Sequence, residues 1–161
     1  MTQPLPPDLH LRAATAADEA QVRALLPQLA DFPIPPRRRA EQLWTCDAEL
    51  ARTVLAGGAS ASFLDVLATA SGEVAGLILV TLRAEMLANT PSAHLEAIVV
   101  HPDHRGRGLG KWLMAHCEAR VRARGAASLT LHVFDRNERA KALYVGQGYD
   151  LEIVRAVKWL D

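Results

Sequence analysis

Apolar residues recur along the chain in two rhythms, one typical of strands and one typical of helices. Short apolar runs predict strands over residues 9–14, 63–69, 74–83, 95–100, 129–134 and 151–159. Apolar spacings of three and four predict helices after Thr15, over residues 40–56, from Leu109 to about 124 and after Asn137. Pro27 falls inside the first helix pattern and is expected to kink or divide that helix. Residues 84–93 are predicted to form a loop.

The length and the even distribution of these elements predict one domain. The 161 residues suit a single core of ordinary size, and the chain has no internal repeat or low-complexity tract. Residues 1–7 contain three prolines and are predicted to be a flexible N-terminal arm. The single domain is therefore placed at residues 8–161.

The charge balance argues against two classes of partner. The chain carries 18 Lys and Arg against 18 Asp and Glu, so it has no general attraction for nucleic acid or membrane surfaces. Arg120, Arg122 and Arg124 are interpreted as a solvated helix end. No apolar run approaches the roughly 20 residues of a membrane span, and residues 1–7 lack a signal-peptide pattern. We therefore expect a cytoplasmic protein.

The densest chemical signal lies where the strand at 95–100 gives way to the helix that begins near Leu109. Three glycines stand within five residues there, at positions 106, 108 and 110. Backbone without Cβ atoms can approach an anion closely and direct several N–H groups at it, aided by the helix dipole. Arg105, Arg107 and Lys111 add positive charge. The segment is predicted to be an anion-binding turn.

Spacing separates three phosphate-binding patterns. A P-loop needs G-x-x-x-x-G-K-[ST], but Gly106 is one residue too close to Gly110-Lys111, and Trp112 stands in place of the hydroxyl. A dinucleotide fingerprint needs G-x-G-x-x-G, whereas these glycines run G-x-G-x-G. The pattern [QR]-x-x-G-x-[GA] fits in full as Arg105-x-x-Gly108-x-Gly110. With this motif the chain resembles the GNAT superfamily of acyl-CoA-dependent N-acetyltransferases, whose turn holds the pyrophosphate of coenzyme A.

A second motif strengthens the resemblance. The family pattern N-x-x-A-x-x-x-Y-x-x-x-G-[FY] is matched at every named position by Asn137, Ala140, Tyr144, Gly148 and Tyr149. Asn137 also suits a helix N-cap, and Ala140 and Tyr144 share one helical face. The resemblance is specific over residues 95–149.

The resemblance implies a fold and a co-substrate. The expected fold is α/β (α+β) and GNAT-like, with a mixed, mostly antiparallel, splayed sheet flanked by about four helices. The implied co-substrate is acetyl-CoA, with no metal. The residues expected to bind it are Ile98, Val99, Val100, Arg105, Gly106, Arg107, Gly108, Leu109, Gly110, Lys111, Asn137 and Tyr144.

The resemblance also implies catalytic roles. An alkyl amine with a pKa of about 10 must lose a proton before it attacks a thioester. Tyr144 matches the family's general acid, and Glu96 lies where many members carry a carboxylate that takes the amine proton. His94 is a second candidate base, because the charge of histidine changes near neutral pH. Regular strand alternation would put His94, Glu96 and Ile98 on one face.

The implied function is transfer of an acetyl group from acetyl-CoA to a primary amine, by direct attack in a ternary complex. Two alternatives remain: a non-catalytic acyl-CoA-binding or sensing domain, and an acyltransferase acting on a protein N-terminus or with a larger acyl group. His101 and His104 are expected to make loop contacts rather than bind zinc. A homodimer through the last predicted strand follows by analogy, and Arg37, Arg38 and Arg39 are hypothesised to attract an anionic group on the acceptor.

Overall fold

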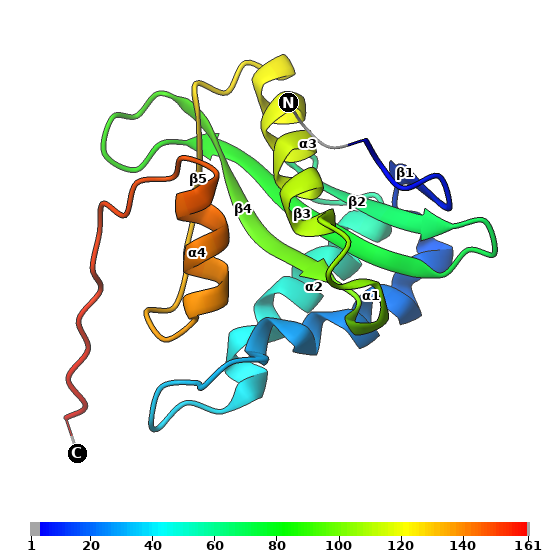
Figure 1. The fold of residues 1–161 in the computed structure, drawn as a ribbon. Coiled ribbons are helices and arrows are strands. Elements are labelled where there is room, and N and C mark those ends of the chain that lie inside the picture. Colours follow the sequence, from blue (N-terminus) through cyan, green and yellow to red (C-terminus); the bar gives the residue numbers. More distant parts are fainter. Residues whose placement is uncertain (1–3, 161) are drawn as a thin grey trace.

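The computed structural model describes residues 4–160, and its centre is one five-stranded sheet (Figure 1). The strand order β1-β2-β3-β4-β5 follows the sequence. The first four strands pair antiparallel and β4 pairs parallel with β5, which confirms the predicted mixed, mostly antiparallel sheet. The strands are β1 Leu9–Ala13, β2 Ser62–Thr69, β3 Val74–Ala84, β4 Pro91–Val100 and β5 Ser128–Leu131.

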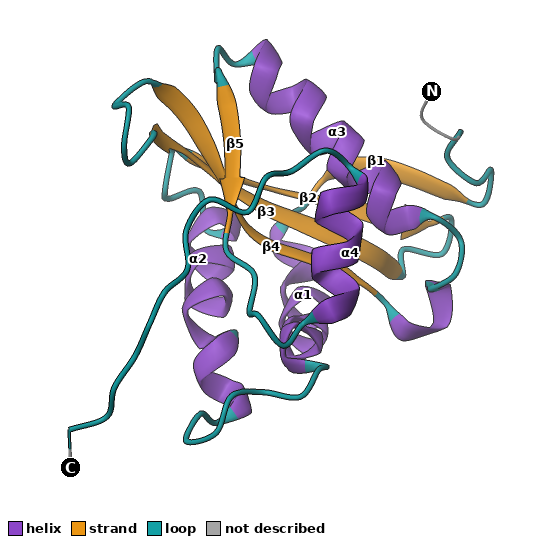
Figure 2. Ribbon diagram, turned by 60° about the vertical axis from the view of Figure 1, so that its left-hand side comes forward, coloured by secondary structure: helices purple, strands orange, loops and turns teal. Residues whose placement is uncertain are grey.

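Helices cover both faces of the sheet (Figure 2). The first two pack on one face, in a core that joins Val22 and Ala51 to Leu79 and Ala97. The other two helices pack on the opposite face, where Leu113 and Tyr144 share a core with sheet side chains such as Ile78 and Leu95. The expected architecture of about four helices around a sheet is confirmed. The helices are α1 Glu19–Leu25, α2 Thr45–Leu55, α3 Leu109–Ala123 and α4 Glu138–Gly146.

The first two helices are shorter than their apolar patterns suggest. α1 ends at Leu25 and the chain continues as a 3-10 turn, Leu26–Ala30, with Pro27 in its first positions, so the predicted division at this proline is confirmed. The helix predicted over residues 40–56 begins as a 3-10 turn, Ala40–Leu43. Trp44 has a φ of −139°, outside the helical range, and α2 starts only after it.

A bulge in β4 decides which side chains meet at the site. Leu95 and Ala97 lie opposite consecutive residues of β3, so Glu96 between them is an extra residue. As a result Leu95 and Ile98 both pack in the core under α3, while Ala97 packs in the core under α2. The expectation that Glu96 and Ile98 share a face is therefore wrong, because a bulge reverses the alternation beyond it.

β4 and β5 pair briefly and then separate, as the expected splay requires. Their pairing runs from Ser92 and Ser128 to Leu95 and Leu131 and ends there, while β4 continues to Val100 with β3 as its neighbour. The strand predicted to reach residue 134 therefore stops at Leu131. The predicted loop at 84–93 is also shorter, because β4 begins at Pro91.

The helix behind the glycine turn is held to the sheet by a buried ionic cluster. Asp65 of β2 is 1% exposed and accepts a hydrogen bond from His116 at 2.9 Å. Arg120 forms an ion pair with the same carboxylate and lies over the ring of Phe63. The interpretation of Arg120 as part of a solvated helix end is wrong, because an acid buried beneath the helix needs a counter-ion.

The last predicted strand is not formed. Residues 151–160 follow α4 as an extended, exposed segment that leads away from the sheet (Figure 1). Several large apolar side chains on it are exposed, among them Val154 and Leu160. Near its end, the ring of Trp159 lies under the guanidinium groups of Arg37 and Arg38, at 5.3 and 5.0 Å. The strand prediction over residues 151–159 is therefore wrong for this chain by itself.

The N-terminal residues and the helix lengths complete the description. Residues 1–3 of the predicted arm lie outside the described residues, and in the remainder Leu5 packs against the core under α3. Flexibility of the arm stays a prediction. Among the helices of residues 4–160, none has both the length and the apolar character needed to span a membrane.

Candidate active site

The glycine turn has the backbone geometry that an anion-binding turn requires. After the short turn Pro102–His104, Gly106 and Gly108 adopt φ angles of 77° and 75°. These left-handed angles favour glycine, because a Cβ atom would be strained there. Gly108 is the N-cap of α3, so the turn delivers the chain directly onto the positive end of a 15-residue helix.

The turn offers an unbroken row of hydrogen-bond donors. Within residues 4–160, the backbone amides of residues 106–111 donate to no other group. The first bonded amide is that of Trp112, which donates to the carbonyl of Gly108 at 3.1 Å. Six consecutive free amides at a helix N-terminus constitute a site that favours an anion.

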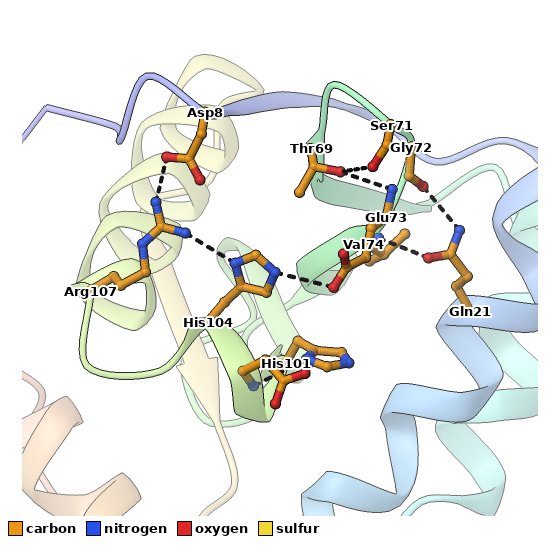
Figure 3. Close-up of polar contacts among 11 residues, drawn as sticks. Asp8, Gln21, Thr69, Ser71, Gly72, Glu73, Val74, His101, His104 and Arg107 are labelled. Carbon is orange, nitrogen blue, oxygen red and sulfur yellow. Dashed lines mark hydrogen bonds and ion pairs between the residues drawn. The ribbon is translucent and has the colours of Figure 1, made fainter.

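The two arginines of the turn are engaged by acids rather than left facing the amides. Arg105 forms an ion pair with Asp31 at 2.9 Å and donates to Gln28 Oε1 at 2.8 Å. Arg107 pairs with Asp8 and donates to His104 (Figure 3). Both guanidinium groups thus already have acceptors within the described residues, whereas the backbone amides of the turn do not.

The histidines before the turn make the expected loop contacts. Because His104 Nδ1 accepts from Arg107 at 3.0 Å, its Nε2–H is the donor to Glu73 at 3.2 Å (Figure 3). His101 Nδ1 accepts the amide of Asp103 at 3.2 Å. In the described part of the chain, no group of three or more His, Cys, Asp and Glu residues is arranged to hold a metal ion.

The second half of β4 presents backbone groups to the gap that opens beyond Leu95. The amide of His101 donates to Ala75 of β3 at 2.9 Å, and amide direction alternates along a strand. Val99 therefore faces β3 with its backbone, whereas the amides of Ile98 and Val100 face the gap. Of the three residues expected to bind through this strand, two point their backbone into the opening.

Tyr144 lies in α4 on the α3 side of the sheet. It is 7% exposed, and burial raises its pKa to about 12. Its hydroxyl has no hydrogen-bond partner among the described side chains and backbone, so it remains an available donor. Asn137 caps α4 by accepting the amide of Ala140 at 3.1 Å, as predicted. Leu143 of the same helix lies 3.5 Å from where a Cβ on Gly110 would stand, so α4 packs against the glycine turn.

The two candidate bases have different surroundings. His94 is buried and its Nδ1 lies 2.8 Å from Thr130 Oγ1. Burial, reinforced by the charges of Arg83 and His132, lowers the pKa of His94 to about 4. His94 is therefore neutral near pH 7 and a weak acceptor of an ammonium proton. Glu96, on the bulge, is only partly buried and has no ion pair with any described residue.

A second carboxyl group, that of Asp47 on α2, lies near Glu96. Asp47 stands one turn before Ala51 and three residues after Trp44, on the helical face that packs in the α2-side core. Burial first, and the charge of Glu96 second, raise the pKa of Asp47 to about 7. No described cation pairs with Asp47. Asp47 and Glu96 thus lie near each other on the α2 side of the sheet with no counter-ion from residues 4–160.

Two contacts at the gap were not anticipated from the sequence. The rings of His94 and His132 lie 4.7 Å apart, and those of Phe32 and Phe134 lie 5.4 Å apart. His132 and Phe134 continue beyond β5, and Phe32 comes from the segment after α1. The one sequence signal for this arrangement is that His132 and Phe134 alternate with the apolar residues at 129, 131 and 133, so that they point to the α2 side.

The fold and the two motifs agree with comparisons to known proteins. Residues 23–149 match the model of the acetyltransferase (GNAT) family, a span that contains the sheet gap, the glycine turn and α4. The chain belongs to the GNAT acetyltransferase family. This family uses acetyl-CoA as its acyl donor.

Two curated acetyltransferases are similar to this chain over part of their length. An uncharacterized N-acetyltransferase of Bacillus subtilis, YdgE, is 34% identical over 79 residues, which cover 49% of this chain and 50% of that protein. Streptothricin acetyltransferase of Streptomyces lavendulae is 38% identical over 80 residues, covering 50% of this chain and 40% of that protein. The chain thus spans half or less of the length of these curated relatives.

A solved structure supports the GNAT fold over nearly the whole chain. The acetyltransferase of Trypanosoma brucei superposes with a TM-score of 0.67 at 21% identity, covering 95% of this chain and 100% of the other. At that identity the likeness concerns the fold alone. The free amides of the turn are donors of the kind that a pyrophosphate accepts. The backbone amides that face the gap beside β4 are donors of the kind that a thioester carbonyl accepts.

Proposed function

We propose that this protein is an N-acetyltransferase that moves an acetyl group from acetyl-CoA to a primary amine by direct attack in a ternary complex. The observation that carries the proposal is the row of six free amides at residues 106–111, at the head of α3 and next to the gap between β4 and β5. This arrangement suits an elongated ligand with a pyrophosphate at one end and a reactive carbonyl further along the gap.

The residues of the gap divide the reaction between two faces of the sheet. The amides of Ile98 and Val100 are placed to donate to the thioester carbonyl as its oxygen becomes negative. Tyr144, on the α3 side, donates a proton to the departing thiolate. Glu96, on the α2 side, faces the amine. The low pKa of His94 favours Glu96 over His94 as the group that interacts with the ammonium.

Acetyl-CoA binding is tested by replacing the N-cap glycine of α3. Acetyl-CoA should raise the Tm of the native protein, because a ligand selective for the native state stabilises it by mass action. Gly108→Asp sets a negative charge against the free amides and should abolish the shift. Gly125→Asp is the matched control, since Gly125 also has a positive φ, of 86°, but ends α3 at its far end. Equal acetyl-CoA shifts in both folded variants would rule out binding at this turn.

Catalysis is distinguished from mere binding by release of free coenzyme A thiol. Amine-dependent thiol release supports a transferase, whereas acetyl-CoA binding without release across an amine panel would support the alternative of an acyl-CoA-binding or sensing domain. The hydroxyl of Tyr144, which has no hydrogen-bond partner among the described residues, favours the transferase, because a binding domain has no need of an acid there. Panels of longer acyl-CoAs and of short peptides test the other alternative, a larger acyl group or a protein N-terminus.

We also propose that a second copy covers the C-terminal segment. Residues 151–160 expose several large apolar side chains, and within residues 4–160 β5 pairs on one edge only, with β4. A strand from another protomer at the open edge would bury both. Light scattering of the intact protein and of a variant with Val154 and Val157 changed to Lys tests this. A monomer at micromolar concentration in both cases would contradict it.

A further inference from the structure

His132, a histidine to which no role has been given so far, lies opposite Glu96 where β4 and β5 separate. The parallel register pairs Leu95 with Leu131 and then ends, so Glu96 and His132 are the next residues on the two strands. They stand at the first position where the strands part. The ring of His132 lies 4.7 Å from that of His94, which fixes its direction.

His132 points to the α2 side of the sheet. Leu129, Leu131 and Val133 pack in the core under α3, so the residues between them face the other way. Phe134, two residues on, meets Phe32 on that same side. His132 is exposed, in contrast to buried His94. Its imidazole therefore lies between the gap and solvent.

The charged groups around His132 come from three elements. On β4, Glu96 stands across the gap and His94 is neutral near pH 7. On β3, the charge of Arg83 lowers the pKa of His94, and on α2, Asp47 lies close enough to Glu96 for the charge of Glu96 to raise the pKa of Asp47. Asp135, three residues after His132, is turned to Lys141. Glu96 and Asp47, which have no counter-ion among the described residues, could bind a cationic group. His132, across the gap from Glu96, could accept a proton from that group.

We propose that His132 accepts the proton that the amine acceptor loses, while Glu96 and Asp47 hold the acceptor's ammonium group. The inference rests on the proposed acetyltransferase function and assigns a catalytic residue to it. Histidine changes charge between pH 5 and 8, which suits transfer from a bound ammonium and release to solvent. The buried imidazole of His94, fixed by Thr130, supports the ring of His132 and stays uncharged.

The proton balance of the reaction is closed by these groups. The ammonium gives one proton to His132, which passes it to water. The resulting amine forms the new C–N bond as the C–S bond breaks. The nitrogen loses its second proton, and the thiolate gains one from Tyr144, whose phenolate is reprotonated by that second proton. One ammonium and one thioester thus give one amide, one thiol and one released proton.

The test compares His132→Gln with His10→Gln, a matched control at an exposed histidine of β1, at the opposite edge of the sheet. Thiol release is measured with acetyl-CoA and benzylamine, spermidine, lysine or kanamycin, using whichever reacts fastest. His132→Gln is expected to lower kcat/KM by about 100-fold at pH 7, with the deficit shrinking toward pH 10, where the amine loses its proton unaided. His10→Gln should match the parent at every pH.

The shape of the profile decides the role of His132. An equal loss at pH 7 and pH 10 would indicate a structural effect and overturn the proposal, as would no loss at all. Partial rescue of His132→Ala by added imidazole supports it, and absence of rescue counts against it. If no amine in the panel releases thiol while acetyl-CoA still raises the Tm, the proposed function fails and this role fails with it.

Discussion

Replacing Tyr144 by Phe removes one oxygen atom and leaves the packing of α4 in place. The hydroxyl has no hydrogen-bond partner within residues 4–160, so the free energy of unfolding should fall by less than about 1 kcal/mol. Loss of a general acid in the transition state is far larger, because such groups contribute about 10²- to 10⁴-fold. We expect kcat to fall about 100-fold, equivalent to about 2.7 kcal/mol, with the Kd for acetyl-CoA nearly unchanged.

The pH dependence of this effect follows from the burial of Tyr144. Burial raises its pKa to about 12, so the phenol keeps its proton, and its ability to donate, throughout pH 6–10. The ratio of parent to Tyr144→Phe rates should therefore be constant over that range. An unburied phenol would start to lose its proton near pH 10, and the ratio would fall there.

Tyr149→Phe is the matched control for this substitution. Tyr149 lies 6.0 Å from Tyr144 ring to ring, but its hydroxyl donates to Glu118 at 3.1 Å. Its loss should cost about 1 kcal/mol of stability and little activity. Steady-state thiol release and urea unfolding of both variants provide the comparison. Full turnover in Tyr144→Phe, or equal losses of turnover in the two variants, would refute the assignment of the acid.

Four further variants have defined outcomes. Asp18 is 4% exposed at its side chain and the bonded Arg12 holds its pKa at about 2, so Asp18→Asn should cost about 2 kcal/mol at pH 7 in urea unfolding. A carboxyl group whose pKa is lower in the folded state than in the unfolded state stabilises the fold at pH values above its unfolded pKa. The difference in unfolding free energy between the parent and Asp18→Asn should therefore shrink as the pH falls from about 4 to 2. Glu96→Gln should depress kcat/KM on the acidic side of the pH–rate profile, where the acceptor is an ammonium, whereas His94→Gln should leave the profile's shape unchanged; the reverse result would assign the interaction with the ammonium to His94. Changing the three arginines of residues 37–39 to Gln should raise the KM of acceptors that carry a carboxylate or phosphate at low salt. Equal KM values for the parent and the triple variant, at both low and moderate salt, would exclude a role of these arginines in attracting an anionic acceptor.

Much of the fold and part of the candidate site were predictable because their signals are local. The glycine turn needs left-handed backbone at positions 106 and 108, and glycine is the residue that meets this need without strain. The cap of α4 depends on one side chain, Asn137, three residues before the amide it receives. Sequence spacing can report such features, because the groups that interact are a few residues apart.

Pairing partners and ion pairs were predicted less well, since they depend on residues far apart in the chain. Arg105 was expected to face the anion, yet it bonds to Asp31, 74 residues away. Arg120 was expected in solvent, yet it reaches the buried Asp65 on β2. Nothing in the local pattern around either arginine states which acid the fold will bring beside it.

The bulge at Glu96 explains why the candidate catalytic residues Glu96, His94 and Tyr144 could not be assigned to faces of the sheet from the sequence. A regular strand would have set Ile98 beside Glu96, and the apolar pattern at 95–100 is compatible with that arrangement. The extra residue instead returns Ile98 to the core under α3 and leaves Glu96 with Ala97 on the α2 side. Glu96 then lies across the gap from His132, and Tyr144 lies on the other face. In the mechanism that we propose, a proton leaves the amine on one side of the sheet while the thiolate receives its proton on the other, so a change to the bulge should disturb both transfers.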